Sequence, residues 1–182
     1  YTADHGAFTG ENSAPMAKDA GADYVLVGHS ERRHIFGDSN DDCARKCAIV
    51  ERAGLTPLLC VGETLEQRER GETSHVVTQQ LRAGLSRLSQ IELTTSVIAY
   101  EPVWAIGTGK NATPEDAAET HGVLRNALTD LIGDRSAEVS ILYGGSVTPA
   151  NVGQILAADD VDGVLVGGAS LEVDSWLSIC SA

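Results

Sequence analysis

The sequence is poor in lysine, in aromatic residues and in long apolar runs. Its 182 residues include 2 Trp, 4 Tyr and 2 Phe, and the lysines are Lys18, Lys46 and Lys110 alone. No apolar run approaches the ~18 residues of a membrane-spanning helix. Residues 1–11 lack the basic and apolar pattern of a secretory signal. We therefore predict no membrane partner.

Positive charge is scarce as well. The chain carries 13 Lys+Arg against 26 Asp+Glu, a formal net charge of −13. This balance argues against nucleic acid and anionic membrane surfaces as partners. It leaves room for a small anionic ligand, because backbone N–H groups bind anions even in an acidic protein.

The cysteines do not form a disulfide or zinc pattern. They are Cys43, Cys47, Cys60 and Cys180, in a chain long enough to form a core without disulfides. Cys43 and Cys47 lie four residues apart, but no second Cys or His pair follows at the spacing of a zinc site. We therefore predict reduced, buried thiols in a cytoplasmic protein that holds no metal and no cofactor.

Five short apolar segments are rich in β-forming residues and end in glycine or a polar residue. Near-continuous apolar runs of this length are typical of parallel strands buried on both faces. The sequence therefore predicts five strands, at residues 24–29, 57–63, 97–101, 139–144 and 163–167.

Helical stretches separate the predicted strands. Residues 40–53 end at Gly54, and residues 64–88 form a longer stretch. Thr113-Pro114 and Thr148-Pro149 are both typical of an N-cap followed by proline at the first helical position.

The alternation of strands and helices predicts one α/β domain over residues 1–182, with a parallel sheet. A closed eight-stranded (β/α) barrel needs about 250 residues. This chain has room for five units, so it is either a piece of such a barrel or an open doubly wound sheet.

Two glycine pairs follow consecutive predicted strands. Gly144-Gly145, with Ser146 after it, and Gly167-Gly168 each run from a strand into a turn. One such pair is more often a simple turn than a site. Two pairs in consecutive loops favour a phosphate site, because glycine lets backbone N–H groups come close to an anion.

His29 and Glu101 also follow predicted strands. A lone histidine here is more often a packed residue than a catalyst. His29 precedes a predicted helix, however, whose N-terminus disfavours the imidazolium form, and a neutral ring can donate to a carbonyl oxygen. Glu101, between Tyr100 and Pro102, is either a salt-bridged residue at the sheet rim or a poorly solvated and therefore stronger base.

Residues 102–110 are apolar in the middle, contain two glycines and precede the helix start at Thr113. This pattern fits an ordinary loop between a strand and a helix. It equally fits a lid that closes over a substrate and excludes water.

Several long motifs occur in a fixed order, and together they resemble the triosephosphate isomerase family. The resemblance covers residues 6–178. GAFTGE at residues 6–11 is similar to a loop of that family that reaches into a partner subunit. The motifs are GHSERR (28–33), LCVGE (59–63), AYEPVWAIGTGK (99–110), YGGSV (143–147) and GVLVGGA (163–169).

The resemblance implies a role for each candidate residue. Glu101 is expected to move a proton between two adjacent carbons, His29 to polarise the carbonyl group, and Glu31 to be a further active-site acid. The substrate would be a small phosphorylated triose of glycolysis and gluconeogenesis. The resemblance further implies phosphate donors at Gly107, Ser146, Gly167 and Gly168, lid-latching contacts at Tyr143 and Ser146, and a lid made of Pro102, Val103, Trp104, Ala105, Ile106, Gly107, Thr108, Gly109 and Lys110.

One family motif is absent from these residues. The family begins with a strand carrying Asn-x-Lys, whose lysine binds the substrate phosphate, and by loop correspondence this sequence starts just after the family's third strand. We expect a parallel TIM-barrel type α/β fold truncated to about five strands. Loss of a preorganised charge typically costs ~10²–10³-fold in rate, so we expect weak or absent catalysis in the isolated chain.

The open barrel predicts an association. Its first and fifth strands would be unpaired edges, and its inner face would expose apolar surface. We therefore expect a homo-oligomer that covers both. Three possibilities stay open: an isomerase, a non-catalytic truncated barrel that self-associates, and a fragment that needs a separate N-terminal segment.

Overall fold

The computed structural model describes residues 1–106 and 112–182. Five parallel strands form one sheet in the order β1-β2-β3-β4-β5, so each strand pairs with the next along the chain. This order is that of a (β/α) barrel, because a doubly wound sheet reverses its order part-way. The strands are β1 Tyr24–Val27, β2 Thr56–Val61, β3 Val97–Tyr100, β4 Ser140–Tyr143 and β5 Gly163–Val164.

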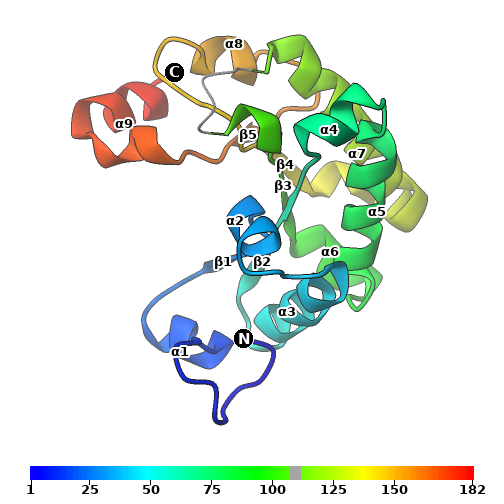
Figure 1. Ribbon diagram of the computed structural model, residues 1–182, viewed down its shortest axis with the longest axis vertical. Helices are drawn as coiled ribbons and strands as arrows, with labels where there is room; N and C mark the ends of the chain where they lie inside the picture. Colours follow the sequence, from blue (N-terminus) through cyan, green and yellow to red (C-terminus); the bar gives the residue numbers. More distant parts are fainter. Residues whose placement is uncertain (107–111) are drawn as a thin grey trace.

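Helices connect the strands. α3, α5, α6 and α7 lie along the convex side of the sheet, while α1 and α9 lie at its two ends (Figure 1). The α-helices are α1 Ala14–Asp19, α2 Ser30–His34, α3 Asn40–Arg52, α4 Leu65–Glu69, α5 Thr73–Leu85, α6 Gln90–Thr95, α7 Pro114–Ile132, α8 Val152–Leu156 and α9 Val173–Cys180, and the 3₁₀ turns are η1 Val103–Ala105, η2 Gly133–Glu138 and η3 Gly168–Leu171.

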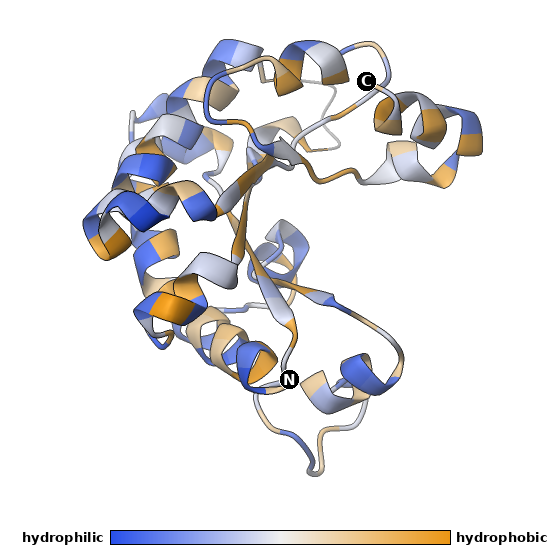
Figure 2. Cartoon of the chain, turned by 180° about the vertical axis from the view of Figure 1, so that it is seen from behind, coloured by the Kyte–Doolittle hydropathy of each residue, from blue (hydrophilic) through white to orange (hydrophobic). Residues whose placement is uncertain are grey.

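The two faces of the sheet pack differently. The outer face, represented by Leu59, Ile98 and Ile141, belongs to one large apolar core with α3, α5 and α7. The inner face carries a small separate cluster around Leu58, Cys60 and Ala99. Figure 2 shows the central strands as largely hydrophobic, while the surrounding helices mix hydrophobic and hydrophilic residues. The sheet is therefore an arc covered mainly from outside.

The predicted helix start at Thr113 is confirmed, and a capping box forms there. Thr113 caps α7 by accepting from the N–H of Asp116, whose carboxylate accepts from the Thr113 N–H. The Thr148-Pro149 prediction was wrong by three residues. Asn151 Oδ1 accepts from the N–H of Thr148 and closes a turn first, so α8 begins only at Val152. Thr148 is therefore part of a turn and does not cap a helix, although a proline follows it.

The single stretch predicted at residues 64–88 is two helices. α4 stops after Glu69 and α5 starts at Thr73. Gly71 lies between them at φ +71°, a left-handed conformation that ends the first helix. The cysteine prediction also needs one correction: all four thiols are free and three are buried, but Cys180, near the end of α9, is exposed.

The two ends of the arc are exposed. Tyr24 and Leu26 on the edge strand β1 are 59% and 48% exposed. At the other end, η3 and α9 expose Leu171, Val173 and Leu177. Among the described residues, no helix is long and apolar enough to span a bilayer. Exposed apolar side chains thus occur at both flanks of the sheet, and others, such as Ile91 on α6, lie elsewhere on the surface.

Candidate active site

His29 stands at the carboxyl end of β1, where the chain turns into α2. Gly28 makes the turn possible at φ +72°. The Nδ1 atom of His29 accepts from the backbone N–H of Glu31 at 3.3 Å. A ring nitrogen that accepts carries no proton, so the proton of a neutral ring lies on Nε2. The Nε2 atom is 3.1 Å from Glu101 Oε1.

Glu101 follows β3 and is 2% exposed. Burial raises the pKa of its carboxyl group. His29, the N–H of Ser30 and the Cys60 thiol oppose that rise by stabilising the charged form. The Ser30 N–H donates to Oε2 at 2.9 Å. The result is a carboxylate with both oxygens engaged and little water around it, which favours proton acceptance from a bound substrate.

Glycines on either side let Glu101 sit this deeply. Its backbone N–H donates to Val61 O at 2.8 Å, which continues the β2–β3 pairing beyond the strands. A Cβ atom at Gly62 would lie 1.7 Å from the Glu101 carbonyl oxygen, so only glycine fits there. A Cβ atom at Gly144 would lie 3.0 Å from Glu101 Cγ. The sequence prediction assigned no role to Gly62, although its motif was visible.

The segment after Glu101 is anchored by a buried acid that sequence reasoning did not assign. Glu63 is fully buried, and its Oε1 atom accepts from Trp104 Nε1 at 2.9 Å and from the Tyr100 hydroxyl at 3.2 Å. Arg68 donates to the same oxygen at 3.2 Å and stacks over the Trp104 ring at 4.6 Å. The described part of the predicted lid, residues 102–106, is therefore fixed at its base.

The predicted glycine loops follow β4 and β5, which are neighbours in the sheet. Gly167 and Gly168 are exposed, and a Cβ atom on either would contact nothing within 4 Å. Asn151 Nδ2 donates to Ser146 O at 2.9 Å and holds the β4 loop in place. Both loops thus lie at the carboxyl ends of the strands, as His29 and Glu101 do. Gly107, Thr108, Gly109 and Lys110 lie outside the described residues.

Tyr143, predicted to hold the lid, ends β4. Burial raises the pKa of its hydroxyl to about 12. Within the described part of the chain, this buried hydroxyl has no hydrogen-bond partner. A Cβ atom at Gly145 would lie 2.2 Å from it, so glycine there leaves the hydroxyl its space.

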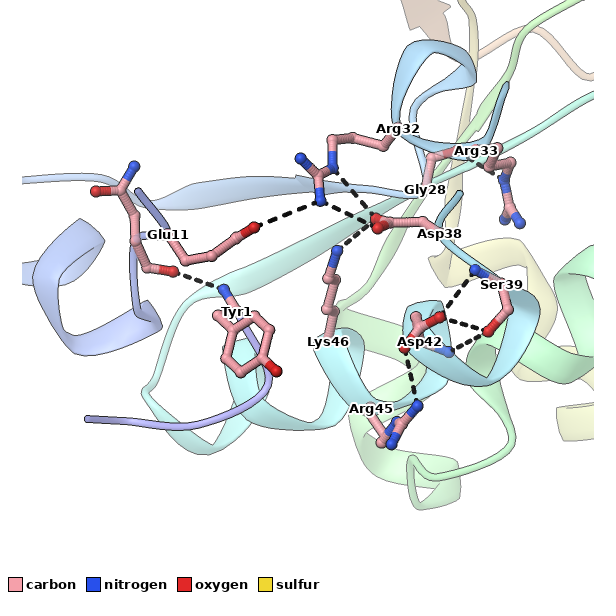
Figure 3. Close-up of polar contacts among 11 residues, drawn as sticks. Tyr1, Glu11, Gly28, Arg32, Arg33, Asp38, Ser39, Asp42, Arg45 and Lys46 are labelled. Carbon is pink, nitrogen blue, oxygen red and sulfur yellow. Dashed lines mark hydrogen bonds and ion pairs between the residues drawn. The ribbon is translucent and has the colours of Figure 1, made fainter. Parts of the chain in front are cut away.

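Both described lysines are engaged away from the pair. Lys18 donates to the carbonyl of Ala53, the C-cap residue of α3, at 2.7 Å. Lys46 pairs with Asp38, as Figure 3 shows. Glu31, predicted as an active-site acid, has an exposed side chain, and none of its contacts in the described chain involves its carboxylate. His29 and Glu101 are therefore in direct contact. In the described part of the chain, the Glu31 carboxylate forms no hydrogen bond or ion pair with either residue.

Comparisons with known proteins show which family the sequence matches. The family model described as triosephosphate isomerase matches residues 1–182. The chain is 53% identical over 180 residues to triosephosphate isomerase of Chlamydia muridarum (strain MoPn / Nigg), covering 98% of this chain and 66% of that protein. It is 50% identical over 177 residues to the Pseudoalteromonas translucida (strain TAC 125) protein of the same name, covering 97% and 71%. The chain spans about two thirds of the length of these relatives.

Proposed function

Because the chain belongs to the triosephosphate isomerase family, we propose that it interconverts glyceraldehyde 3-phosphate and dihydroxyacetone phosphate. The observation that carries the proposal is the contact between Glu101, buried and therefore a stronger base, and the protonated Nε2 of His29. A glutamate base, a neutral histidine and a closing loop are the known machinery of this family, and the proposal assigns these roles to Glu101, His29 and residues 102–110.

In the proposed reaction, Glu101 takes a proton from the carbon next to the substrate carbonyl group. His29 donates its Nε2 hydrogen bond to the carbonyl oxygen, where negative charge develops as the enediolate forms. The protonated Glu101 then returns the proton to the neighbouring carbon, while the substrate's hydroxyl proton moves to the former carbonyl oxygen, so that the carbonyl and hydroxyl groups exchange places. For this to happen, Glu101 must exchange its present contacts with Ser30 and His29 for the substrate.

The substrate phosphate is proposed to bind at the loops after β4 and β5, through the backbone N–H groups of Ser146, Gly167 and Gly168, with Gly107 as a further donor. Exposed glycines after adjacent parallel strands support this assignment. Residues 102–110 would close over the substrate, and Tyr143 and Ser146 would hold them. The unpartnered Tyr143 hydroxyl is available for that contact.

We propose that turnover by these 182 residues alone is slow. Lys18 and Lys46 are engaged elsewhere, so neither neutralises a substrate phosphate at the site. Loss of one preorganised charged donor typically costs ~10²–10³-fold in rate. The free thiols of the buried cysteines fit the predicted cytoplasmic location.

A second candidate is a folded barrel segment that does not catalyse until another chain covers its flanks. Its support is the apolar surface of Tyr24 and Leu26 on β1 and of Leu177 on α9. Unpaired edge strands and apolar patches of this kind favour self-association. We propose a homo-oligomer built through these surfaces, or completion by a separate N-terminal segment.

The test is conversion of glyceraldehyde 3-phosphate in a coupled assay, with Glu101→Gln purified in parallel to reveal contaminating host isomerase. Turnover above the Glu101→Gln background supports the proposed isomerase. Equal rates in both proteins contradict it. Sedimentation of the same samples then decides the second candidate, because a monodisperse monomer at all concentrations contradicts self-association.

A further inference from the structure

Arg33 of α2 has every guanidinium nitrogen engaged. Its Nε atom donates to Gly28 O at 2.7 Å, Nη2 donates to Cys60 O at 3.1 Å, and Nη1 donates to Asn40 Oδ1 at 2.8 Å. One rigid group thereby joins the end of β1, the end of β2 and the first residue of α3. A planar fork with three fixed acceptors has little freedom to move.

Two of these acceptors belong to residues that hold the reacting groups. The Gly28 carbonyl is part of the peptide bond that leads into His29, so the Nε contact fixes the backbone that aims the imidazole. Cys60, whose carbonyl accepts from Nη2, lies close to Glu101, and its thiol stabilises the charged form of that carboxyl group. Arg33 thus bonds to the residue that precedes His29 in the chain and to a residue of β2 that lies beside Glu101.

The space around Arg33 is closed. A Cβ atom at Gly28 would lie 2.8 Å from Nη2 of Arg33 and 2.8 Å from Cys43 Sγ. Gly28 therefore has to be glycine both for its φ of +72° and for the guanidinium packed against it. A shift of Arg33 would be passed directly to the turn that carries His29.

The charge of Arg33 is also unusual for this protein. Its three acceptors are two carbonyl oxygens and an amide oxygen, and no carboxylate of the described residues lies within ion-pair distance. Its neighbour Arg32 points the other way and pairs with Asp38 and Glu11 (Figure 3). The Arg33 charge is therefore left to act on Glu101, whose carboxylate it stabilises.

We propose that Arg33 is the positioning residue of the His29–Glu101 pair, fixing the peptide before His29 and the strand end at Cys60 while supplying a fixed positive charge near Glu101. The inference deepens the proposed isomerase function and rests on it. Arg33 does not contact the substrate; it acts through Gly28 and Cys60. Such a residue affects the chemical step more than substrate binding, because misplacement by about 1 Å costs ~10²-fold in rate.

Two Arg33 variants and one matched control test the proposal. Arg33→Lys keeps the positive charge but loses the planar guanidinium group and its three hydrogen bonds. Arg33→Met loses both the charge and these hydrogen bonds. Arg32→Met removes the adjacent cation of the same helix and leaves Gly28 and Cys60 untouched. Cooperative thermal unfolding of each protein is recorded first, so that site effects are read only from folded proteins.

The first readout does not need activity. Ring ¹⁵N shifts of His29, assigned with His29→Gln, report which nitrogen carries the proton, and the ¹³C shift of the Glu101 carboxyl group reports its titration. In Arg33→Met we expect altered His29 shifts and a Glu101 titration midpoint at higher pH. We expect a smaller rise in Arg33→Lys and no change in Arg32→Met. Unchanged His29 and Glu101 signals in folded Arg33→Met overturn the proposal.

The second readout is turnover above the Glu101→Gln background. We expect kcat to fall about tenfold in Arg33→Lys and about 10²-fold in Arg33→Met, with KM changed less than about threefold. If the unsubstituted chain shows no such turnover, the proposed isomerase function fails, while the NMR readout still decides the role of Arg33. Loss of cooperative unfolding in both Arg33 variants makes Arg33 a residue of the fold alone and also overturns the proposal.

Discussion

The middle of the sheet and its flanks are built from the same kind of sequence but end in opposite environments. Leu59, Ile98 and Ile141 in β2, β3 and β4 are fully buried beneath α5 and α7. Leu26 in β1, equally apolar, is half exposed because it lies on the inner face of the edge strand, in register with Leu58, whereas Val27 on the outer face of the same strand is buried. Whether an apolar residue is buried is therefore decided by what packs against it. We expect the buried residues of β2–β4 to contribute most to the free energy of unfolding.

The candidate active site crosses the boundary between these regions. Glu101 extends from the buried centre, whereas His29 extends from the edge strand β1. Arg33 links the two by bonding to carbonyl groups at the ends of β1 and β2. The proposed chemistry therefore depends most on how firmly Arg33 holds the end of β1 to the end of β2.

The largest expected effect comes from truncating one leucine in each region. Leu59→Ala leaves a cavity in a fully buried position and should lower the free energy of unfolding by about 2–5 kcal/mol. Leu26→Ala should lower it by less than about 1 kcal/mol, because a half-exposed side chain loses little. Urea unfolding of both variants measures the difference. Equal losses would mean that β1 is covered in solution, as an oligomer would cover it.

A buried histidine in the central region predicts a dependence of stability on pH. His121 of α7 is fully buried, and its Nδ1 atom contacts the Asp160 carbonyl at 2.9 Å. Burial lowers the pKa of His121, so the folded protein binds this proton less readily than the unfolded chain. The neutral form is therefore favoured by folding, and this stability is complete above the unfolded pKa of about 6.5.

As the pH falls below that value, the unfolded chain takes up the proton and His121 should cost up to about 1.4 kcal/mol per pH unit. Unfolding free energies from pH 7.5 to 5 measure the slope. His121→Gln should be flatter over this range, whatever its overall stability. Identical slopes in both proteins would assign the pH dependence to other groups.

The smallest effect is expected on the solvent-facing side of the helices. Arg82 of α5 pairs with Asp130 of α7 at 2.6 Å, but both side chains are largely exposed. Surface pairs of this kind contribute less than about 1 kcal/mol. Arg82→Ala should therefore shift the urea midpoint only slightly. A loss comparable to that of Leu59→Ala would show that helix-to-helix ion pairs, and not the buried strands, hold the arc together.

Much of the fold was predictable from local patterns. The five apolar runs predicted the strands, and Thr113 followed by Pro114 predicted the start of α7. The break at Gly71 was missed because helical periodicity continues on both sides of it, and only its backbone angle separates α4 from α5. Exposure of Cys180 depends on what packs beside α9, which local sequence does not encode.

The candidate site was predictable in part, for a different reason. His29 and Glu101 stand next to strand ends, where chemistry-bearing residues of α/β proteins gather. The supporting residues Arg33, Gly62 and Glu63 gave no separate signal, since their roles follow from approaches between strands and loops distant in sequence. Gly62 is required only because the Glu101 backbone passes 1.7 Å from where its Cβ atom would be.

The most direct test of the central claim is proton exchange at the substrate carbon. Dihydroxyacetone phosphate is incubated with the protein in D₂O, and deuterium at the carbon that bears the transferred hydrogen is followed by NMR. This detects proton removal even when net turnover is slow. We expect incorporation above the level of Glu101→Gln prepared in the same way. Incorporation equal in both proteins would contradict the claim that the buried Glu101, held beside His29, acts as a base.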